Sequence, residues 1–198
     1  GGPNPDSNLR LRFEIEAARS ADMPKENIDR AIQRAAGGEG GKVEEVTYEG
    51  YGPGGVAVIV EAATDNKNRT AQEIKNIFER GGGSLAGPGA VSFNFEPKGL
   101  IVVKKEANVE GQMLRLIDLG IEDIEDANDA IEVYMAFDKL SSIKKIVEES
   151  GFNVISAQLV QRPKNFANIT KREEASKVIA FLEVLEEHED VQKVFANI

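Results

Sequence analysis

The stretch from Tyr48 to Thr70, YEGYGPGGVAVIVEAATDNKNRT, constrains the fold more than any other part of this sequence. Its first half contains two strand-like segments joined through GPGG (residues 52–55), which is the pattern of a β-hairpin. A phosphate-binding loop lies between a strand and the start of a helix, whereas these glycines precede a strand. The sequence therefore predicts a tight turn at residues 52–55 and not a phosphate loop.

The second half of this stretch predicts a helix. Thr70 to Glu73 has the form of a capping box, and Ile74, Ile77 and Phe78 share one helical face, so we expect a buried stripe. Two further strand-like segments, AVSFNF and GLIVVKK, follow. The predicted order for this part of the chain is β-β-α-β-β.

The region before the hairpin predicts two helices. The segment LRLRFEIEAARSA alternates with the strand period, but it also spaces Arg–Glu pairs four apart, as a helix does. Its alanine-rich continuation favours the helix. Pro24 suits the first turn of a second helix, which Gly37 and Gly38 end. We interpret GGEGGK (residues 37–42) as a linker.

The second half of the chain alternates helices and strands without a visible sequence repeat. It predicts a helix, two strands, a helix, a strand, an amphipathic helix opened by a capping box at Thr170–Glu173, and a closing strand. These lie at residues 111–119, 121–126, 130–137, 139–149, 153–161, 170–185 and 191–198. Helices between antiparallel strand pairs indicate α+β sandwiches, not a doubly wound parallel sheet.

Acidic residues are concentrated in the second half. The net charge is −10; residues 1–105 carry 14 basic and 15 acidic side chains, and residues 106–198 carry 10 basic and 19 acidic ones. Binding to nucleic-acid phosphates needs clustered Lys and Arg. We therefore expect any nucleic-acid surface in the first half, while the second half suits solvent or a basic protein partner.

The sequence lacks cysteine and lacks any segment that could span a membrane, and both absences limit the class of protein. The chain has no cysteine, which excludes disulfides, thiol nucleophiles and the usual zinc sites. Its longest apolar run, Val56–Val60, is too short to span a bilayer, and no signal-peptide pattern opens the sequence. We expect a cytoplasmic protein that has no membrane contact.

The turn before the predicted helix is the first candidate for anion binding. Lys67, Asn68, Arg69 and Thr70 lie between a strand and a helix, where backbone N–H groups attract anions. Arg also holds phosphate through two parallel hydrogen bonds. The alternative is a capped helix whose Lys67 and Arg69 are merely solvated.

Arginines in the first 36 residues form a second candidate surface for phosphate. Arg10, Arg12, Arg19, Arg30 and Arg34 fall in the two predicted helices. Acidic residues are interleaved with them, which is also typical of a salt-bridged solvent face. We predict phosphate contacts at Arg10, Arg12 and Arg34.

No catalytic set can be assembled from the other residues. His188 is the only histidine, so we interpret it as a surface residue. The carboxylates of IEDIEDANDA lack calcium-loop spacing and indicate a solvated edge. Tyr48, Tyr51 and Phe93 could stack on bases, although aromatic residues in strands more often fill a core. We predict no catalytic residue, no metal and no cofactor.

Several long motifs resemble the YebC family. They are GGPNPDSNLRLR, MPKENIDRAI, YEGYGPGGVAVIVEAATDNKNRT and GPGAVSFNFEPKG, and HEDVQKVFAN matches the family's C-terminal pattern. The family includes the bacterial YebC/PmpR proteins and mitochondrial translational activators of a cytochrome oxidase subunit. The resemblance covers the whole chain with the motifs in the family's order, which makes it specific.

The resemblance implies a three-domain α+β protein. We expect a helical N-terminal domain at residues 1–41, a ferredoxin-like α+β domain at 43–105 plus 172–198, and an acidic α+β domain at 106–171 inserted into it. The family normally opens with a strongly basic segment, whereas this sequence begins later, at Gly1. We expect the intact protein to be less acidic than its net charge of −10 implies.

The resemblance also implies a non-enzymatic regulator of gene expression. Members are described as DNA-binding transcriptional regulators and as ribosome-associated translation factors that help synthesis of proline-rich stretches. We therefore expect contact with promoter DNA or ribosomal RNA, by a monomer or weak oligomer. The competing interpretation is a protein-interaction module whose acidic second half docks on a basic partner.

Overall fold

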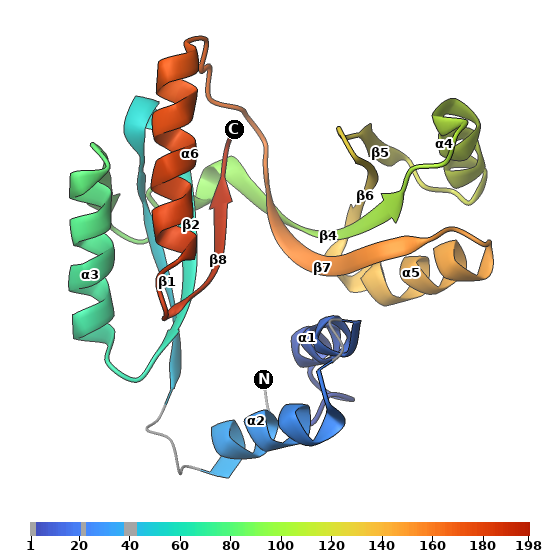
Figure 1. Cartoon of the computed structure of the whole chain (residues 1–198), viewed down its shortest axis with the longest axis horizontal. Helices are drawn as coiled ribbons and strands as arrows, with labels where there is room; N and C mark the ends of the chain where they lie inside the picture. Colours follow the sequence, from blue (N-terminus) through green and yellow to red (C-terminus); the bar gives the residue numbers. More distant parts are fainter. Residues whose placement is uncertain (1–2, 21–22, 38–42) are drawn as a thin grey trace. The chain divides into compact units, whose positions relative to one another are not determined.

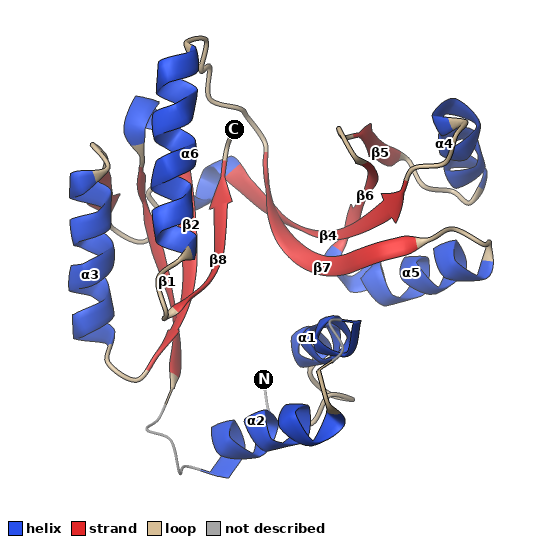
Figure 2. Cartoon of the chain, viewed as in Figure 1, coloured by secondary structure: helices blue, strands red, loops and turns tan. Residues whose placement is uncertain are grey.

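The computed structural model describes residues 3–20, 23–37 and 43–198. The chain divides into two compact units, residues 1–36 with 97–160 and residues 37–96 with 161–198. Each unit is built around one four-stranded sheet with helices (Figures 1 and 2), which confirms the predicted α+β class. None of the helices in the described residues has the length and apolar character needed to cross a bilayer.

In the unit of residues 37–96 and 161–198, helices α3 and α6 lie side by side on one face of the sheet (Figure 1). The strand order is β3-β1-β2-β8. The elements are β1 (Glu44–Tyr51), β2 (Ala57–Thr64), α3 (Lys67–Arg80), β3 (Ser84–Ala86), α6 (Arg172–Glu186) and β8 (Val191–Ala196). The rings of Phe78 and Phe181 meet edge to face, 5.1 Å apart, and join the two helices.

Strand β2 is buried on both of its faces, which explains its nearly continuous apolar run. Val58 and Val60 face α3 and α6 and share a core with Ile74. Ala57 and Ile59 alternate with them, and they form a second cluster with Val91 and Phe95. A strand with apolar contacts on each side fixes its register strongly, because a slip of one residue would exchange the two sets.

The glycine-rich segment at residues 52–55 is confirmed as a turn. Strands β1 and β2 pair antiparallel up to Tyr51 and Ala57, and the 3₁₀ turn η1 (Pro53–Gly55) connects them. Gly54 and Gly55 have φ of 72° and 75°, in the left-handed region that favours glycine. The turn leads into a strand, so it lacks the helix N-terminus that a phosphate loop requires.

The unit of residues 1–36 and 97–160 has the strand order β5-β6-β4-β7. Its elements are α1 (Leu9–Ser20), α2 (Lys25–Gly37), β4 (Phe95–Lys104), α4 (Val109–Asp118), β5 (Asp123–Asp126), β6 (Ala130–Ala136), α5 (Leu140–Glu149) and β7 (Val154–Pro163). Phe13 of α1 is buried in the same core as Ile101 and Leu140. The helix predicted over LRLRFEIEAARSA is thereby confirmed.

Strand β4 lies in the second of the two sheets. It pairs with β6 from Lys98 opposite Ala136 to Lys104 opposite Ala130, so it belongs to the second sheet. Residues 97–105 therefore group with 106–160, and residues 161–171 group with the hairpin unit. The predicted β-β-α-β-β order is confirmed, but its last strand pairs in the other sheet, because alternating apolar residues show which face is buried and not which strand is the neighbour.

The predicted strand AVSFNF is wrong at residues 90–94. These residues lie in a turn that contains the 3₁₀ segment η2 (Ser92–Asn94), and Phe95 begins β4. The Glu49 carboxylate accepts hydrogen bonds from the backbone N–H groups of Gly89, Val91 and Ser92 at 2.8, 2.8 and 2.9 Å. These donors are thus withdrawn from any strand ladder. Apart from Gly37, the predicted linker GGEGGK lies outside the described residues.

Candidate nucleic-acid interface

The helix α3 begins earlier than its sequence pattern predicts. Asn66 is the N-cap, and its Oδ1 accepts a hydrogen bond from Arg69 N at 3.2 Å. Thr70 therefore lies inside the first turn, and the capping box predicted there is wrong. The box predicted at Thr170 is wrong for a similar reason, because Lys171 is the N-cap of α6 and its side chain makes no capping bond.

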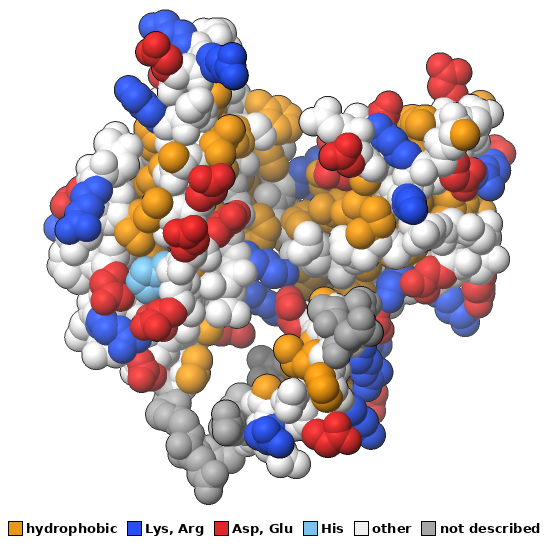
Figure 3. Space-filling view, in the orientation of Figure 1, with side chains coloured by type: hydrophobic (Ala, Val, Ile, Leu, Met, Phe, Trp, Pro, Cys, Tyr) orange, Lys and Arg blue, Asp and Glu red, His pale blue; other side chains and the backbone are white. Residues whose placement is uncertain are grey.

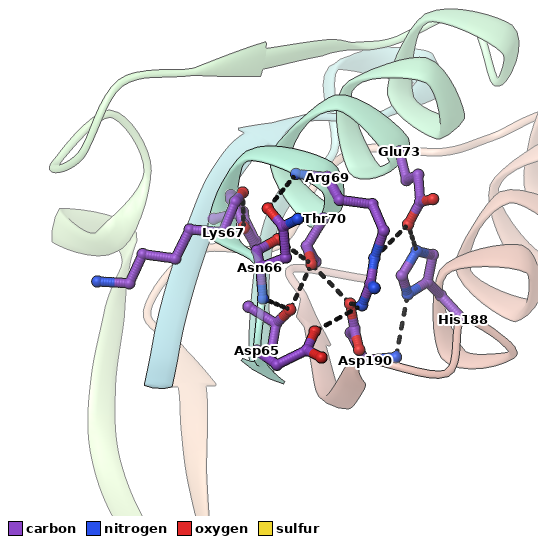
Figure 4. Close-up of polar contacts among 10 residues, drawn as sticks. Asp65, Asn66, Lys67, Arg69, Thr70, Glu73, His188 and Asp190 are labelled. Carbon is purple, nitrogen blue, oxygen red and sulfur yellow. Dashed lines mark hydrogen bonds and ion pairs between the residues drawn. The ribbon is translucent and has the colours of Figure 1, made fainter. Parts of the chain in front are cut away.

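The Thr70 side chain is buried and points toward Asp190 (Figure 4), so it is not available to an anion outside the protein. Its hydroxyl donates to Asp190 Oδ2 at 2.6 Å and lies 2.8 Å from Thr64 Oγ1. Asp190 follows α6 in the chain and is almost completely buried. Burial acts to raise the pKa of Asp190, but the hydrogen bonds from Thr70 and Arg69 outweigh it, and the pKa is lowered.

Arg69 is surrounded by carboxylates. Its Nη2 lies 3.0 Å from Asp190 Oδ2 and 3.1 Å from Asp65 Oδ1, and its Nε lies 4.0 Å from Glu73 Oε2. The hydrogen bond to Asp190 raises the pKa of Arg69. We call Asp65, Arg69, Glu73, His188 and Asp190 the α3 cluster; it ties the start of α3 to the loop after α6 (Figure 4).

His188 is held within the α3 cluster. Its Nδ1 accepts a hydrogen bond from Asp190 N at 3.2 Å, and its Nε2 lies 3.0 Å from Glu73 Oε2. With Nδ1 accepting, Nε2 carries the proton and donates to Glu73. Only 11% of the His188 side chain is exposed, so the interpretation as a surface residue is wrong. Because both ring nitrogens have partners, the ring does not present a general base to a substrate.

The α3 cluster contains residue types that bind metals. Ligand atoms of Glu73, His188 and Asp190 all lie within 4.8 Å of one another. However, the Arg69 guanidinium already pairs with Asp190 and lies near Glu73. A divalent cation would have to displace this positive charge, so the geometry supports an ion-pair network better than a metal site.

The other two predicted α3 residues differ in exposure and pairing. The Lys67 ammonium forms an ion pair with Glu44 on β1. Asn68 is exposed in the first turn of α3. Contact of Lys67, Asn68, Arg69 and Thr70 with nucleic acid stays a prediction, and the structure shows that both of the cationic groups have carboxylate partners.

The predicted arginines of the first helices belong to the other unit. Arg12 donates from Nε to Pro5 O at 3.3 Å and from Nη2 to Asp6 O at 3.0 Å, so it supports the loop before α1. Arg10 is half-buried in α1 and has an interaction partner, and Arg34 lies in α2. The structure therefore brings Lys67–Thr70 together in one turn, while these three arginines lie in a different unit.

Part of the α3 cluster was visible in the sequence. Asp65 and Glu73 lie four residues before and after Arg69, which is the spacing of helical ion pairs. Asp190 and His188 lie more than a hundred residues away, and nothing local indicates their contact with α3.

Comparison with known proteins gives the family. The domain family described as “TACO1/YebC second and third domain” matches residues 43–198, and “TACO1/YebC protein N-terminal domain” matches residues 1–38. The chain belongs to the TACO1/YebC family. The resemblance seen in the sequence motifs is thus confirmed.

Individual TACO1/YebC relatives match the whole chain. It is 46% identical to a “probable transcriptional regulatory protein” of Dictyoglomus thermophilum and 48% identical to one of Thermotoga maritima, covering 80% and 78% of those proteins. The crystal structure of a conserved hypothetical protein from Aquifex aeolicus is 46% identical, with a TM-score of 0.90, and 82% of that chain is covered. The relatives' names support a regulatory role, and the crystal structure supports the fold.

Proposed function

We propose that this chain is a non-enzymatic regulator of gene expression that acts by contacting nucleic acid. The observation that carries the proposal is the segment QRPKNFANITKR (residues 161–172), which has four basic and no acidic side chains. It lies between two acidic stretches, 106–160 and 173–198, with 12 and 7 acidic against 4 and 2 basic side chains. We call residues 161–172, which run from the last three residues of β7 to the first residue of α6, the basic loop.

Cations of the basic loop are available to phosphate. Lys164, Lys171 and Arg172 are exposed, and Figure 3 shows Lys and Arg side chains at the top, where the loop enters α6, with an acidic side chain among them. Phosphate contacts supply most of the affinity in sequence-independent binding to nucleic acid. The basic loop therefore supports contact better than the α3 cluster, where the Arg69 charge is already paired.

The target is either promoter DNA, for a transcriptional regulator, or ribosomal RNA, for a translation factor that relieves stalling on proline-rich stretches. The relatives named as probable transcriptional regulatory proteins support the first form. Binding to a duplex promoter fragment and to purified ribosomes, each with nuclease-treated controls, separates the two.

One observation favours a protein-interaction module as the second candidate. Helix α4 exposes Leu114 and Ile117, and the acidic residues Glu110 and Asp118 lie on the same helix. An apolar surface with an acidic border suits a basic protein partner. This surface belongs to the other unit, so both contacts are compatible with one chain.

The test of the proposed function is fluorescence anisotropy with labelled 12-nucleotide RNA and DNA strands and their duplexes. Lys171→Gln/Arg172→Gln should lower affinity about tenfold, since two cations that face phosphate are removed. The matched control is Lys139→Gln/Lys145→Gln, which removes two exposed cations from the other unit and should change affinity less than about twofold. The proposal fails if the chain binds none of these probes, or if both variants bind as the unchanged chain does.

A further inference from the structure

We infer that Phe93, Lys164 and Phe166 form a stacking site for unpaired bases of a single-stranded nucleic acid. We call these three residues the aromatic patch. The inference rests on the proposed function, and it adds a place of contact and a class of ligand. The sequence pattern offered Phe93 for base stacking but favoured a core position for it, and it indicated no contact for Lys164 or Phe166.

Three aromatic rings are exposed among the described residues of this unit, Phe93 and Phe166 the most and Tyr51, at 37%, the least. Phe93 and Phe166 are 64% and 65% exposed, whereas Tyr48 is buried in the core as the strand pattern predicts. The Tyr51 hydroxyl donates to Ala90 O at 3.0 Å and so holds the turn that carries Phe93. Burying a large aromatic ring is favourable, so a ring held outside the core is a candidate for contact with a ligand.

The two rings lie on neighbouring segments. Lys164 N donates to Asn94 O at 2.7 Å, and Lys164 Nζ donates to Phe93 O at 3.0 Å. Phe166 is two residues beyond Lys164, so their Cα atoms are at most about 7 Å apart. The Lys164 ammonium therefore lies against the turn of Phe93, and Phe166 follows it by two residues in the chain.

Buried polar side chains hold both segments in place. Glu49 fixes the turn before Phe93 through three backbone N–H groups. Asn197 fixes the segment of Phe166: its Nδ2 donates to Asn165 O at 3.1 Å, and its backbone O accepts from Ala167 N at 2.7 Å. Asn197 is itself buried and accepts from Ala57 N. The backbone segments that carry the two rings are thus pre-organised, which reduces the entropy lost on binding.

The charged residues near the aromatic patch favour a negatively charged ligand. Residues 81–95 carry no charged side chain, Glu96 follows them, and the basic loop carries only positive side chains. A negatively charged backbone with flat apolar faces fits both features, and single strands bind through cations with aromatic stacking. A basic peptide is repelled, and a duplex keeps its bases stacked inside. The ligand class is therefore unpaired RNA or DNA.

The chain has no tryptophan, so a single introduced indole reports on the patch alone. Phe93→Trp keeps a ring at this exposed position, and stacking on a nucleobase quenches indole fluorescence. We expect quenching of about half or more on titration with 12-nucleotide oligo(U) RNA or oligo(dT) DNA, and little with a duplex of equal length. Phe137→Trp, an exposed position in the other unit, is the control and should not be quenched.

Affinity gives the second readout. Phe93→Ala and Phe166→Ala should each weaken single-strand binding about tenfold. Phe93→Tyr keeps an aromatic ring and should bind as tightly as the unchanged chain. Phe137→Ala should leave it unchanged. Retained binding by both alanine variants, with no quenching of the indole in Phe93→Trp, overturns the stacking site while the proposed function stands. Equal quenching by duplex and single strand overturns the single-strand class, and absence of binding by the unchanged chain overturns both proposals.

Discussion

The α3 cluster and the basic loop lie at opposite ends of the same strand. Ala63 N, near the end of β2, donates to Asp190 O at 2.8 Å, and Ala57 N, at its start, donates to Asn197 Oδ1 at 2.8 Å. With about 3.3 Å per residue, the two ends are separated by roughly 20 Å. Both sites place cations at the start of a helix, and the cation of the α3 cluster, Arg69, is paired with Asp65 and Asp190.

The difference shows that the neighbours of a cation decide its role. Arg69 satisfies every local criterion for an anion site, since it lies in the first turn of a long helix. Its guanidinium nevertheless contacts two carboxylates and so joins α3 to the loop before β8. The twelve residues of the basic loop include no carboxylate, and Lys171 and Arg172 at its end are exposed. We therefore assign a structural role to the α3 cluster and a contact role to the basic loop.

Removal of Glu49 is expected to have the largest effect. Glu49→Ala leaves three backbone N–H groups without their acceptor, and it should lower the free energy of unfolding by about 3 kcal/mol in urea titrations. The looser turn should also weaken single-strand binding several-fold, although Glu49 touches no ligand. Glu45→Ala, an exposed glutamate on the same strand, is the control and should cost less than about 0.5 kcal/mol. Unchanged binding by a folded Glu49→Ala protein would contradict the pre-organised patch.

Removal of Asp190 tests the structural role of the α3 cluster. Asp190→Ala takes away the acceptor of the buried Thr70 hydroxyl and the closest partner of Arg69, so we expect a loss of about 2 kcal/mol of unfolding free energy. Nucleic-acid affinity should be unchanged at temperatures where the variant is folded. Asp65→Ala, which removes an exposed partner of Arg69, should cost less than about 0.5 kcal/mol.

Acid should weaken this unit through the same carboxylates. The pKa values of Glu49 and Asp190 are lowered from their ordinary values of 4.5 and 3.8, against the effect of burial, by hydrogen bonds to their ionised forms. Their stabilisation is complete above these ordinary values and is lost as the pH falls through the lowered ones, by at most about 1.4 kcal/mol per pH unit for each group. Thermal unfolding of Glu49→Gln and Asp190→Asn should therefore depend less steeply on pH below about 4 than that of the unchanged chain.

Local patterns in the sequence predicted most elements correctly. The hairpin turn follows from Gly54 and Gly55, and the buried stripe of α3 follows from Ile74 and Phe78. The turn at Phe93 did not follow, because AVSFNF alternates like a strand and the competing acceptor, Glu49, lies about forty residues earlier. The sheet to which β4 belongs could not be predicted for the same reason, because it depends on pairing with β6, about thirty residues later in the chain.

The positive charge of the basic loop is visible in the sequence, but the net charge of the whole second half hides it. Summed over residues 106–198, its four positive charges disappear into a net of −9. A shorter window shows them, together with Phe166. The exposure of Phe93 and its bond to Lys164 were not readable, because they depend on contacts between segments about seventy residues apart.

Removal of Arg69 is expected to have the smallest effect. Arg69→Ala breaks a partly exposed ion pair and should cost about 1 kcal/mol or less in unfolding free energy. RNA affinity should change less than about twofold. A tenfold drop in affinity in a fully folded Arg69→Ala protein would instead restore α3 as a phosphate site.

The salt dependence of binding tests the central contrast most directly. For single-stranded RNA, the slope of log affinity against log salt becomes shallower by about 0.7 for each phosphate that the protein no longer neutralises. We predict a slope shallower by about 1.4 for Lys171→Gln/Arg172→Gln and an unchanged slope for Lys67→Gln/Arg69→Gln. The reverse pattern, with the slope altered only by the α3 substitutions, would contradict the assignment of phosphate contact to the basic loop.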